Sequence, residues 1–101
     1  MTPLLVRPAA EADIADAALW YEARALGLGT EFLRAVDVAL AEIQRMPGRF
    51  PTVHLTCRRA LLRRFPYAIF FVPTSEVIQV IACLHASRDP RRWQERVGDD
   101  R

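Results

Sequence analysis

The segment from Arg58 to Val72 constrains the fold more than any other part of the chain. It begins as an alternating basic strand, is interrupted at Pro66, and continues as the most apolar run in the sequence. Proline cannot donate a hydrogen bond within a sheet, so Pro66 marks a turn or the first residue of a strand. The strand that follows is apolar on both faces. The chain itself must cover both faces, or one face is kept for a partner.

Two amphipathic helices are predicted before this segment. Apolar side chains recur at helical spacing in the first helix, at Ile14, Ala17, Ala18, Tyr21 and Ala25. The glycines of Gly27-Leu28-Gly29 would end that helix, and Thr30 would cap the next one. The second helix carries a stripe formed by Leu33, Val36, Leu40 and Ile43, joined by Phe32 and Ala39. So short a link predicts an antiparallel hairpin that buries both stripes against a sheet.

The order of elements predicts a single α+β domain over residues 1–101. We expect a first strand in residues 1–8, a helical hairpin in 9–47, and a three-strand antiparallel region in 58–85. The hairpin would pack on a small, mainly antiparallel sheet, and residues 50–56 would form an extended connection. A short C-terminal helix is predicted over 89–97, and residues 98–101 are expected to fray.

Several classes of protein are disfavoured by the composition. No apolar run approaches the roughly 20 residues of a membrane span, and the N-terminus has no signal-peptide core. The cysteines and histidines are not paired at a zinc-ligand spacing, so we expect neither a metal nor a cofactor. Cys57 and Cys83 occur in apolar, strand-like segments that favour buried, reduced thiols. A cytoplasmic protein without membrane contact is the resulting expectation.

Charge is distributed unevenly along the chain. The net charge is +2, but residues 1–46 carry −3 and residues 47–101 carry +5, and every basic residue is arginine. One arginine cluster belongs to a strand (Arg58, Arg59, Arg63 and Arg64), and the other to the C-terminal segment (Arg88, Arg91, Arg92 and Arg96). If both clusters line one end of the sheet, their guanidinium groups could bind phosphates or the carboxylates of an acidic partner. The alternative is a solvated rim with internal salt bridges.

An ordered set of motifs resembles the RelE/ParE toxin superfamily over residues 3–96. The motifs are Asp13-Ile14, Trp20-Tyr21-Glu22, Gly27-Leu28-Gly29, Glu31-Phe32-Leu33, Phe50-Pro51, Arg64-Phe65-Pro66-Tyr67 and His85-x-x-Arg88-Asp89-Pro90-x-x-Trp93-x-x-Arg96. They are most similar to the ParE-like, "plasmid stabilisation" branch. The resemblance implies a small sheet covered by a helical hairpin. It also implies the toxin of a type II toxin–antitoxin pair, silenced by a cognate antitoxin that wraps around it.

The two branches of this superfamily differ in mechanism. RelE-type members cut messenger RNA on the ribosome with an arginine, a lysine and a tyrosine or histidine. This chain has Ala68 where that branch has an arginine, has no lysine, and has Trp93 in place of a late tyrosine. Losing one positioned acid–base group typically costs about 10²–10⁴ in rate. The resemblance therefore favours a ParE-like toxin without catalytic residues, which inhibits a cellular target, with DNA gyrase as the candidate.

This interpretation assigns residues to two surfaces. The target-binding candidates are Arg88, Arg91, Arg92, Trp93 and Arg96. The antitoxin-binding candidates are Arg58, Arg59, Arg63, Arg64 and Phe70. DNA would be contacted only through the antitoxin. We also expect the isolated chain to self-associate, because its apolar faces would normally be covered by a partner.

Two alternatives stay open at this stage. One is a ribosome-dependent endoribonuclease with a reduced catalytic site formed by His85 and Arg88. The other is a protein that has lost toxicity and only binds an antitoxin.

Overall fold

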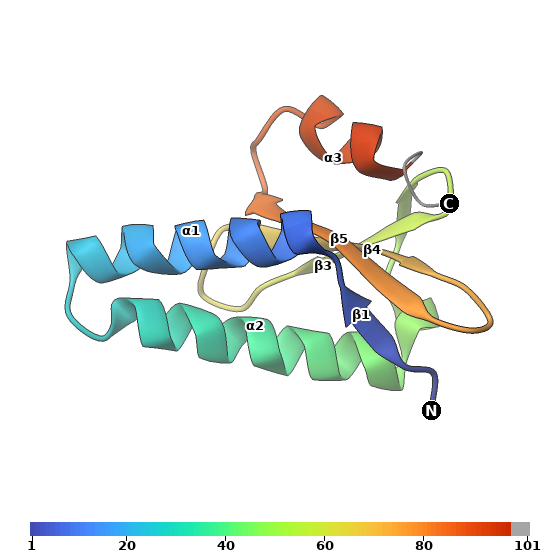
Figure 1. The fold of residues 1–101 in the computed structure, drawn as a ribbon, viewed down its shortest axis with the longest axis horizontal. Helices are drawn as coiled ribbons and strands as arrows, with labels where there is room; N and C mark the ends of the chain where they lie inside the picture. The colour runs from blue at the N-terminus through green and yellow to red at the C-terminus, as the bar shows by residue number, and fades with distance from the viewer. Residues whose placement is uncertain (98–101) are drawn as a thin grey trace.

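The computed structural model describes residues 1–97, and the fraying predicted for residues 98–101 lies outside them. The chain forms, in order, β1 (Leu4–Val6), α1 (Pro8–Arg24), α2 (Leu28–Arg45), the 3₁₀ turn η1 (Pro47–Arg49), β2 (Thr52–His54), β3 (Cys57–Leu61), β4 (Tyr67–Pro73), β5 (Ile78–His85) and α3 (Arg91–Val97). Figure 1 shows α1 and α2 side by side as a hairpin, with α3 on the other side of the strands. This arrangement confirms the predicted α+β class.

The five strands form one mixed sheet in the order β1-β5-β4-β3-β2. Strand β1 pairs in parallel with β5, and the other neighbours are antiparallel. Strand β2 lies where the sequence predicts only an extended connection. It is a three-residue edge strand whose pairing with β3 is irregular, so it has no alternating pattern to reveal it.

The helical hairpin covers one face of the sheet. Its larger core contains Phe32, Val36 and Ile43 from α2 and Ile69 and Phe71 from β4, all at most 2% exposed. The buried line along α2 is centred on Phe32, Val36, Ala39 and Ile43. Leu33, expected in the buried stripe, is 42% exposed at the edge of that line. Helix α2 is therefore rotated slightly from the orientation that apolar spacing alone suggests.

Helix α3 covers the opposite face of the sheet. Trp93 is buried, and its ring stacks on that of Phe70 with centroids 4.3 Å apart and planes 15° from parallel. The second core also contains Cys57, Ile81 and Leu84. The chain's own helices thus cover both apolar faces of β4, which answers the question raised by its sequence.

Glutamate and glycine residues define the turn between α1 and α2. Gly27 has φ 88°, in the left-handed region that favours glycine. Glu22 accepts hydrogen bonds from the backbone N–H groups of Gly27 and Gly29, each at 2.9 Å. The predicted cap at Thr30 is wrong: Gly27 is the N-cap, and Thr30 lies inside α2. A carboxylate from the preceding helix replaces the local side-chain cap.

No helix within residues 1–97 is both long enough and apolar enough to cross a membrane.

Candidate functional site

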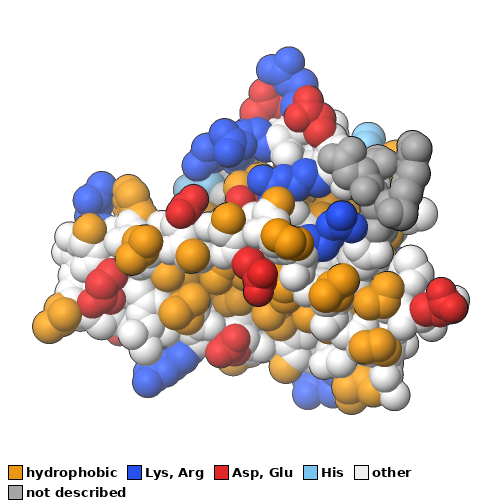
Figure 2. All heavy atoms as spheres, viewed as in Figure 1, with side chains coloured by type: hydrophobic (Ala, Val, Ile, Leu, Met, Phe, Trp, Pro, Cys, Tyr) orange, Lys and Arg blue, Asp and Glu red, His pale blue; other side chains and the backbone are white. Residues whose placement is uncertain are grey.

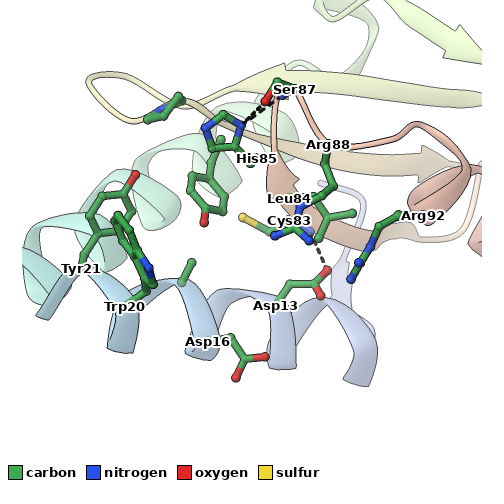
Figure 3. Close-up of a pocket in the computed structure, with 13 residues that line it drawn as sticks. Asp13, Asp16, Trp20, Tyr21, Cys83, Leu84, His85, Ser87, Arg88 and Arg92 are labelled. Atoms are coloured by element: carbon green, nitrogen blue, oxygen red, sulfur yellow. Dashed lines mark hydrogen bonds between the residues drawn. The ribbon is translucent and has the colours of Figure 1, made fainter. Parts of the chain in front are cut away.

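A cavity of about 690 Å³ opens between α1, the end of β5 and the segment that leads into α3 (Figure 3). The α1 wall consists of Asp13, Asp16, Ala17, Trp20 and Tyr21. The opposite wall includes Pro66, Tyr67, Cys83, Leu84, His85, Ser87, Arg88 and Arg92. The volume lies within the range of small-ligand sites. We call this cavity the α1–β5 pocket.

One end of the α1–β5 pocket is strongly charged. Figure 3 shows Arg88 and Arg92 on the side of Asp13, away from Trp20 and Tyr21. Within residues 1–97, neither guanidinium group forms an ion pair, whereas Asp13 is already paired with Arg96 at 2.6 Å. Asp13 also accepts the backbone N–H of Cys83 at 3.0 Å. The unpaired cations at this end are therefore available to an anionic ligand.

His85 lies between the two ends of the pocket, and its hydrogen bonds fix its neutral tautomer. The backbone N–H of Ser87 donates to His85 Nδ1 at 3.1 Å, and Ser87 Oγ lies 2.8 Å from the same atom. Because Nδ1 acts as an acceptor, the proton of the neutral ring is on Nε2. That nitrogen is then a hydrogen-bond donor.

Aromatic rings form the other end. Tyr21 makes edge contacts with Trp20 at 5.1 Å and with Tyr67 at 5.9 Å between centroids. Burial raises the pKa of the Tyr67 phenol, and the nearby Arg88 charge partly opposes this. Burial also raises the pKa of Tyr21, with a further contribution from Tyr67. Both phenols are therefore neutral donors at physiological pH.

Trp20 is half exposed, which is unusual for so large an apolar side chain. The Arg24 guanidinium lies 4.1 Å from its ring centroid. The structure makes Trp20 part of the pocket wall.

The C-terminal target-binding candidates occupy three different environments. Arg88 and Arg92 line the α1–β5 pocket. Arg91 forms an exposed pair with Asp89 at 2.7 Å, and this contact lowers the pKa of the Asp89 carboxyl. Trp93 and Arg96 instead hold α3 in place, through Phe70 and Asp13 respectively. Figure 2 shows basic side chains gathered around α3 and hydrophobic side chains across the hairpin.

Three of the antitoxin-binding candidates on β3 and the loop after it, Arg58, Arg63 and Arg64, have partners within the chain. Arg63 pairs with Glu42, and Arg64 pairs with Glu31, so both fasten the loop to α2. Arg58 donates to the carbonyl of Phe50. These contacts favour the alternative in which the arginines form internal salt bridges and hydrogen bonds over the one in which they form a single basic patch. Phe70 is only 3% exposed beneath Trp93.

Arg59 differs from the other arginines of this set. Its Nε is buried and has no hydrogen-bond acceptor within residues 1–97. Its Cα partner in the sheet is Phe70. Because this nitrogen is buried, an acceptor from another molecule could reach it only if the surrounding side chains moved.

Sequence reasoning did not identify Asp13, Asp16, Trp20 or Tyr67 as site residues. They come from a helix and a strand that only the tertiary fold brings together. Asp13, Trp20 and Tyr67 belong to the motifs that carry the superfamily resemblance, whereas Asp16 belongs to none of them.

The two thiols have no features of a reactive site. Burial raises the pKa of Cys57 to about 11 and that of Cys83 to about 12, with the Asp13 charge also raising the latter. Within residues 1–97, no group of three or more His, Cys, Asp or Glu side chains could hold a metal ion.

The sheet order, the hairpin on one face and the short helix on the other define an α+β fold that can be compared with solved structures. The chain is similar in structure to a chain of the chromosomal ParDE TA system from P. aeruginosa, with a TM-score of 0.64 and 20% sequence identity. The match covers 84% of this chain and 96% of that chain. At this identity the likeness shows a common fold, and it confirms the resemblance at that level. No family model and no curated protein matches the chain.

Proposed function

We propose that this chain is the toxin of a type II toxin–antitoxin system, is ParE-like, and is neutralised by a cognate antitoxin. The observation that carries the proposal is the fold shared with a chain of a ParDE TA system over 84% of the sequence. The motif resemblance, found from the sequence alone, points in the same direction. The toxin would bind and inhibit a cellular target, for which DNA gyrase is the candidate.

The structure suggests where an antitoxin could bind. Arg59 Nε has no acceptor within residues 1–97, so an antitoxin carboxylate or carbonyl would relieve an unsatisfied buried donor. Arg63 and Arg64 could exchange their α2 partners for antitoxin carboxylates at little cost, because both pairs are largely solvent-exposed. Phe70 could be reached only if Trp93 moved away.

The test combines expression in cells with a purified gyrase reaction. We expect growth arrest on expression and reversal by the antitoxin encoded beside the chain. Supercoiling by gyrase should be inhibited, and cleaved DNA trapped, by the protein but not by its antitoxin complex. Normal supercoiling at a protein level that arrests growth would remove gyrase as the target.

A second candidate function is an endoribonuclease of RelE type. The observation that favours it is the convergence of His85, Arg88, Arg92 and Tyr67 on one pocket. These groups could donate to a phosphate and stabilise developing negative charge. Cleavage of messenger RNA in arrested cells, lost in His85→Ala, would establish this function and exclude the non-catalytic one.

The third possibility is a relic without toxicity. Expression without growth arrest, together with antitoxin binding in a pull-down, would identify it. Growth arrest would exclude it.

A further inference from the structure

The α1–β5 pocket has chemically different ends that suit a particular class of ligand. Asp13 and Trp20 lie seven residues apart on α1, which at 1.5 Å per residue places the two ends about 10 Å apart. Figure 3 shows Arg88 and Arg92 at the Asp13 end, Trp20 and Tyr21 at the other, and His85 between them. A single nucleotide has a phosphate and a base at its two ends, joined by one sugar, so a pocket with a cationic end and an aromatic end matches this class of ligand.

We propose that the α1–β5 pocket binds a nucleoside monophosphate unit, with the phosphate at Arg88 and Arg92 and the base against Trp20. Guanidinium groups bind phosphate oxygens through paired hydrogen bonds. Arg88 and Arg92 form no ion pair within residues 1–97, so phosphate binding would break no existing pair there. Arg96, by contrast, is committed to Asp13.

The aromatic end supplies the reason to choose a nucleotide over a simple anion. Trp20 is 50% exposed, and Arg24 approaches its ring without lining the pocket. A base stacked on an aromatic side chain contributes about 1–3 kcal/mol. Such a contact would also cover apolar surface that the chain leaves in water.

The polar groups between the ends suit a sugar and a base edge. The donor set comprises His85 Nε2 and the phenols of Tyr21 and Tyr67, which remain protonated at neutral pH. Asp16 is exposed on the α1 wall, and its carboxylate can accept from a sugar hydroxyl or an exocyclic amine. A carboxylate-bearing peptide would use the arginines but leave the stacking surface and Asp16 unused.

This ligand could be a free nucleotide or the phosphorylated end of a nucleic-acid strand. The proposal does not rest on the ParE-like function, but it uses the same pocket as the second candidate, the endoribonuclease. Ligand binding and cleavage of messenger RNA are measured separately, so the failure of one is distinguished from the failure of the other. Ligand binding in the pocket can be tested whether or not the protein inhibits gyrase.

Binding should be measured on the full chain by NMR titration with AMP, UMP, adenosine, inorganic phosphate, and dinucleotides phosphorylated at the 5′ or the 3′ end. We expect saturable shifts in Trp20, His85 and Arg88 with AMP or UMP, and at least about tenfold weaker binding of adenosine and of phosphate. A tighter dissociation constant for a dinucleotide identifies a strand end as the source, and an equal one identifies the free nucleotide.

The variants separate the two ends of the pocket. Arg88→Gln combined with Arg92→Gln should weaken both AMP and phosphate at least about tenfold. Trp20→Ala should weaken AMP and leave phosphate unchanged. Arg91→Gln is the matched control, because Arg91 belongs to the same segment but lies outside the pocket and pairs with Asp89.

Two results would overturn the proposal. One is the absence of saturable shifts with any nucleotide at millimolar concentration, in protein whose spectrum shows it to be folded. The other is an equal loss of binding in Arg91→Gln and in the Arg88→Gln, Arg92→Gln pair, which would indicate non-specific attraction by positive charge.

Discussion

At the scale of single residues, Asp13 joins three elements. Its side chain is only 12% exposed, pairs with Arg96 of α3, and accepts the N–H of Cys83 from β5. Arg96 also donates to the carbonyl of Ile81 at 3.0 Å, at the point where the β4–β5 register shifts. One carboxylate and one guanidinium thus satisfy backbone groups at an irregular strand edge.

Asp13→Ala should destabilise the fold by about 2–3 kcal/mol, because it leaves the Cys83 N–H and a partly buried Arg96 without their acceptor. Urea denaturation measures the change. Asp89→Asn is the control, since the Asp89–Arg91 pair is exposed, and its unfolding midpoint should be unchanged. Equal midpoints for Asp13→Ala and the unsubstituted chain would contradict the role assigned to Asp13.

Because both thiols are buried, we expect the chain to lose stability in alkaline solution. Their pKa values are about 11 and about 12 in the folded chain, above the ordinary thiol value. Between pH 9 and these values the unfolded state has fewer bound protons than the folded state. The free energy of unfolding therefore falls as pH rises, by up to about 1.4 kcal/mol per pH unit for each thiol.

Denaturation curves at several pH values between 8 and about 11 test this slope. In Cys83→Ala the free energy of unfolding should fall less steeply with pH, because one of the two thiols is then absent. A slope that is identical with and without Cys83 would show that other groups, such as the phenols of Tyr21 and Tyr67, cause the effect.

At the scale of elements, Gly29 permits the close packing of α1 on α2. A Cβ at this position would lie 2.6 Å from the carbonyl oxygen of Ala18 and 2.9 Å from Glu22 Oε1. Gly29→Ala should therefore force the helices apart and cost about 1–3 kcal/mol. Gly48→Ala is the matched control, because a Cβ there meets nothing within 4 Å. Thermal unfolding compares the two, and similar melting temperatures would refute the packing argument.

Helix α3 is held to the sheet mainly by one aromatic contact and one ion pair. Trp93→Ala removes the stack on Phe70 and should cost about 3–5 kcal/mol if the site cannot collapse. Because α3 is short and follows the last strand, we expect the loss to appear first as local opening. Hydrogen exchange should become fast in α3 while β4 remains protected. Protection of α3 equal to that in the unsubstituted chain would count against this.

At the scale of the whole molecule, the expected self-association stays a prediction, but its physical reason changes. Both faces of β4 are covered by the chain itself, so β4 supplies no exposed face. The apolar side chains that remain exposed on the hairpin include Leu19 at 70% and Leu33 at 42%, and others, such as Leu55 and Leu61, lie outside it. Light scattering of the concentrated chain should show self-association that Leu19→Glu with Leu33→Glu reduces. A monomer at high concentration would disprove it.

Much of the fold follows from local patterns. The apolar spacing of residues 9–47 predicts two helices, and the β-branched and aromatic runs predict β4 and β5, because each pattern matches the period of its element. The errors have a common cause. Strand β2 pairs with residues only three to six positions away, and the Gly27 N–H is bonded by Glu22, five residues before it. Apolar spacing encodes neither contact, nor the exposure of Leu33, because all three depend on how neighbouring segments pair or pack.

Some features of the candidate site likewise follow from the sequence, and others depend on the fold. Residue types and their order are enough to establish that His85 ends the predicted last strand and that several arginines follow it. Which of the chain's arginines are available depends on the fold: Arg63, Arg64, Arg91 and Arg96 have carboxylate partners, whereas Arg88 and Arg92 face a cavity. The physical reason is that an ion pair or a pocket is a property of positions in space. Asp13 and Trp20 line the same cavity as Arg88 and Arg92 because α1 packs against β5, and no local pattern encodes that contact.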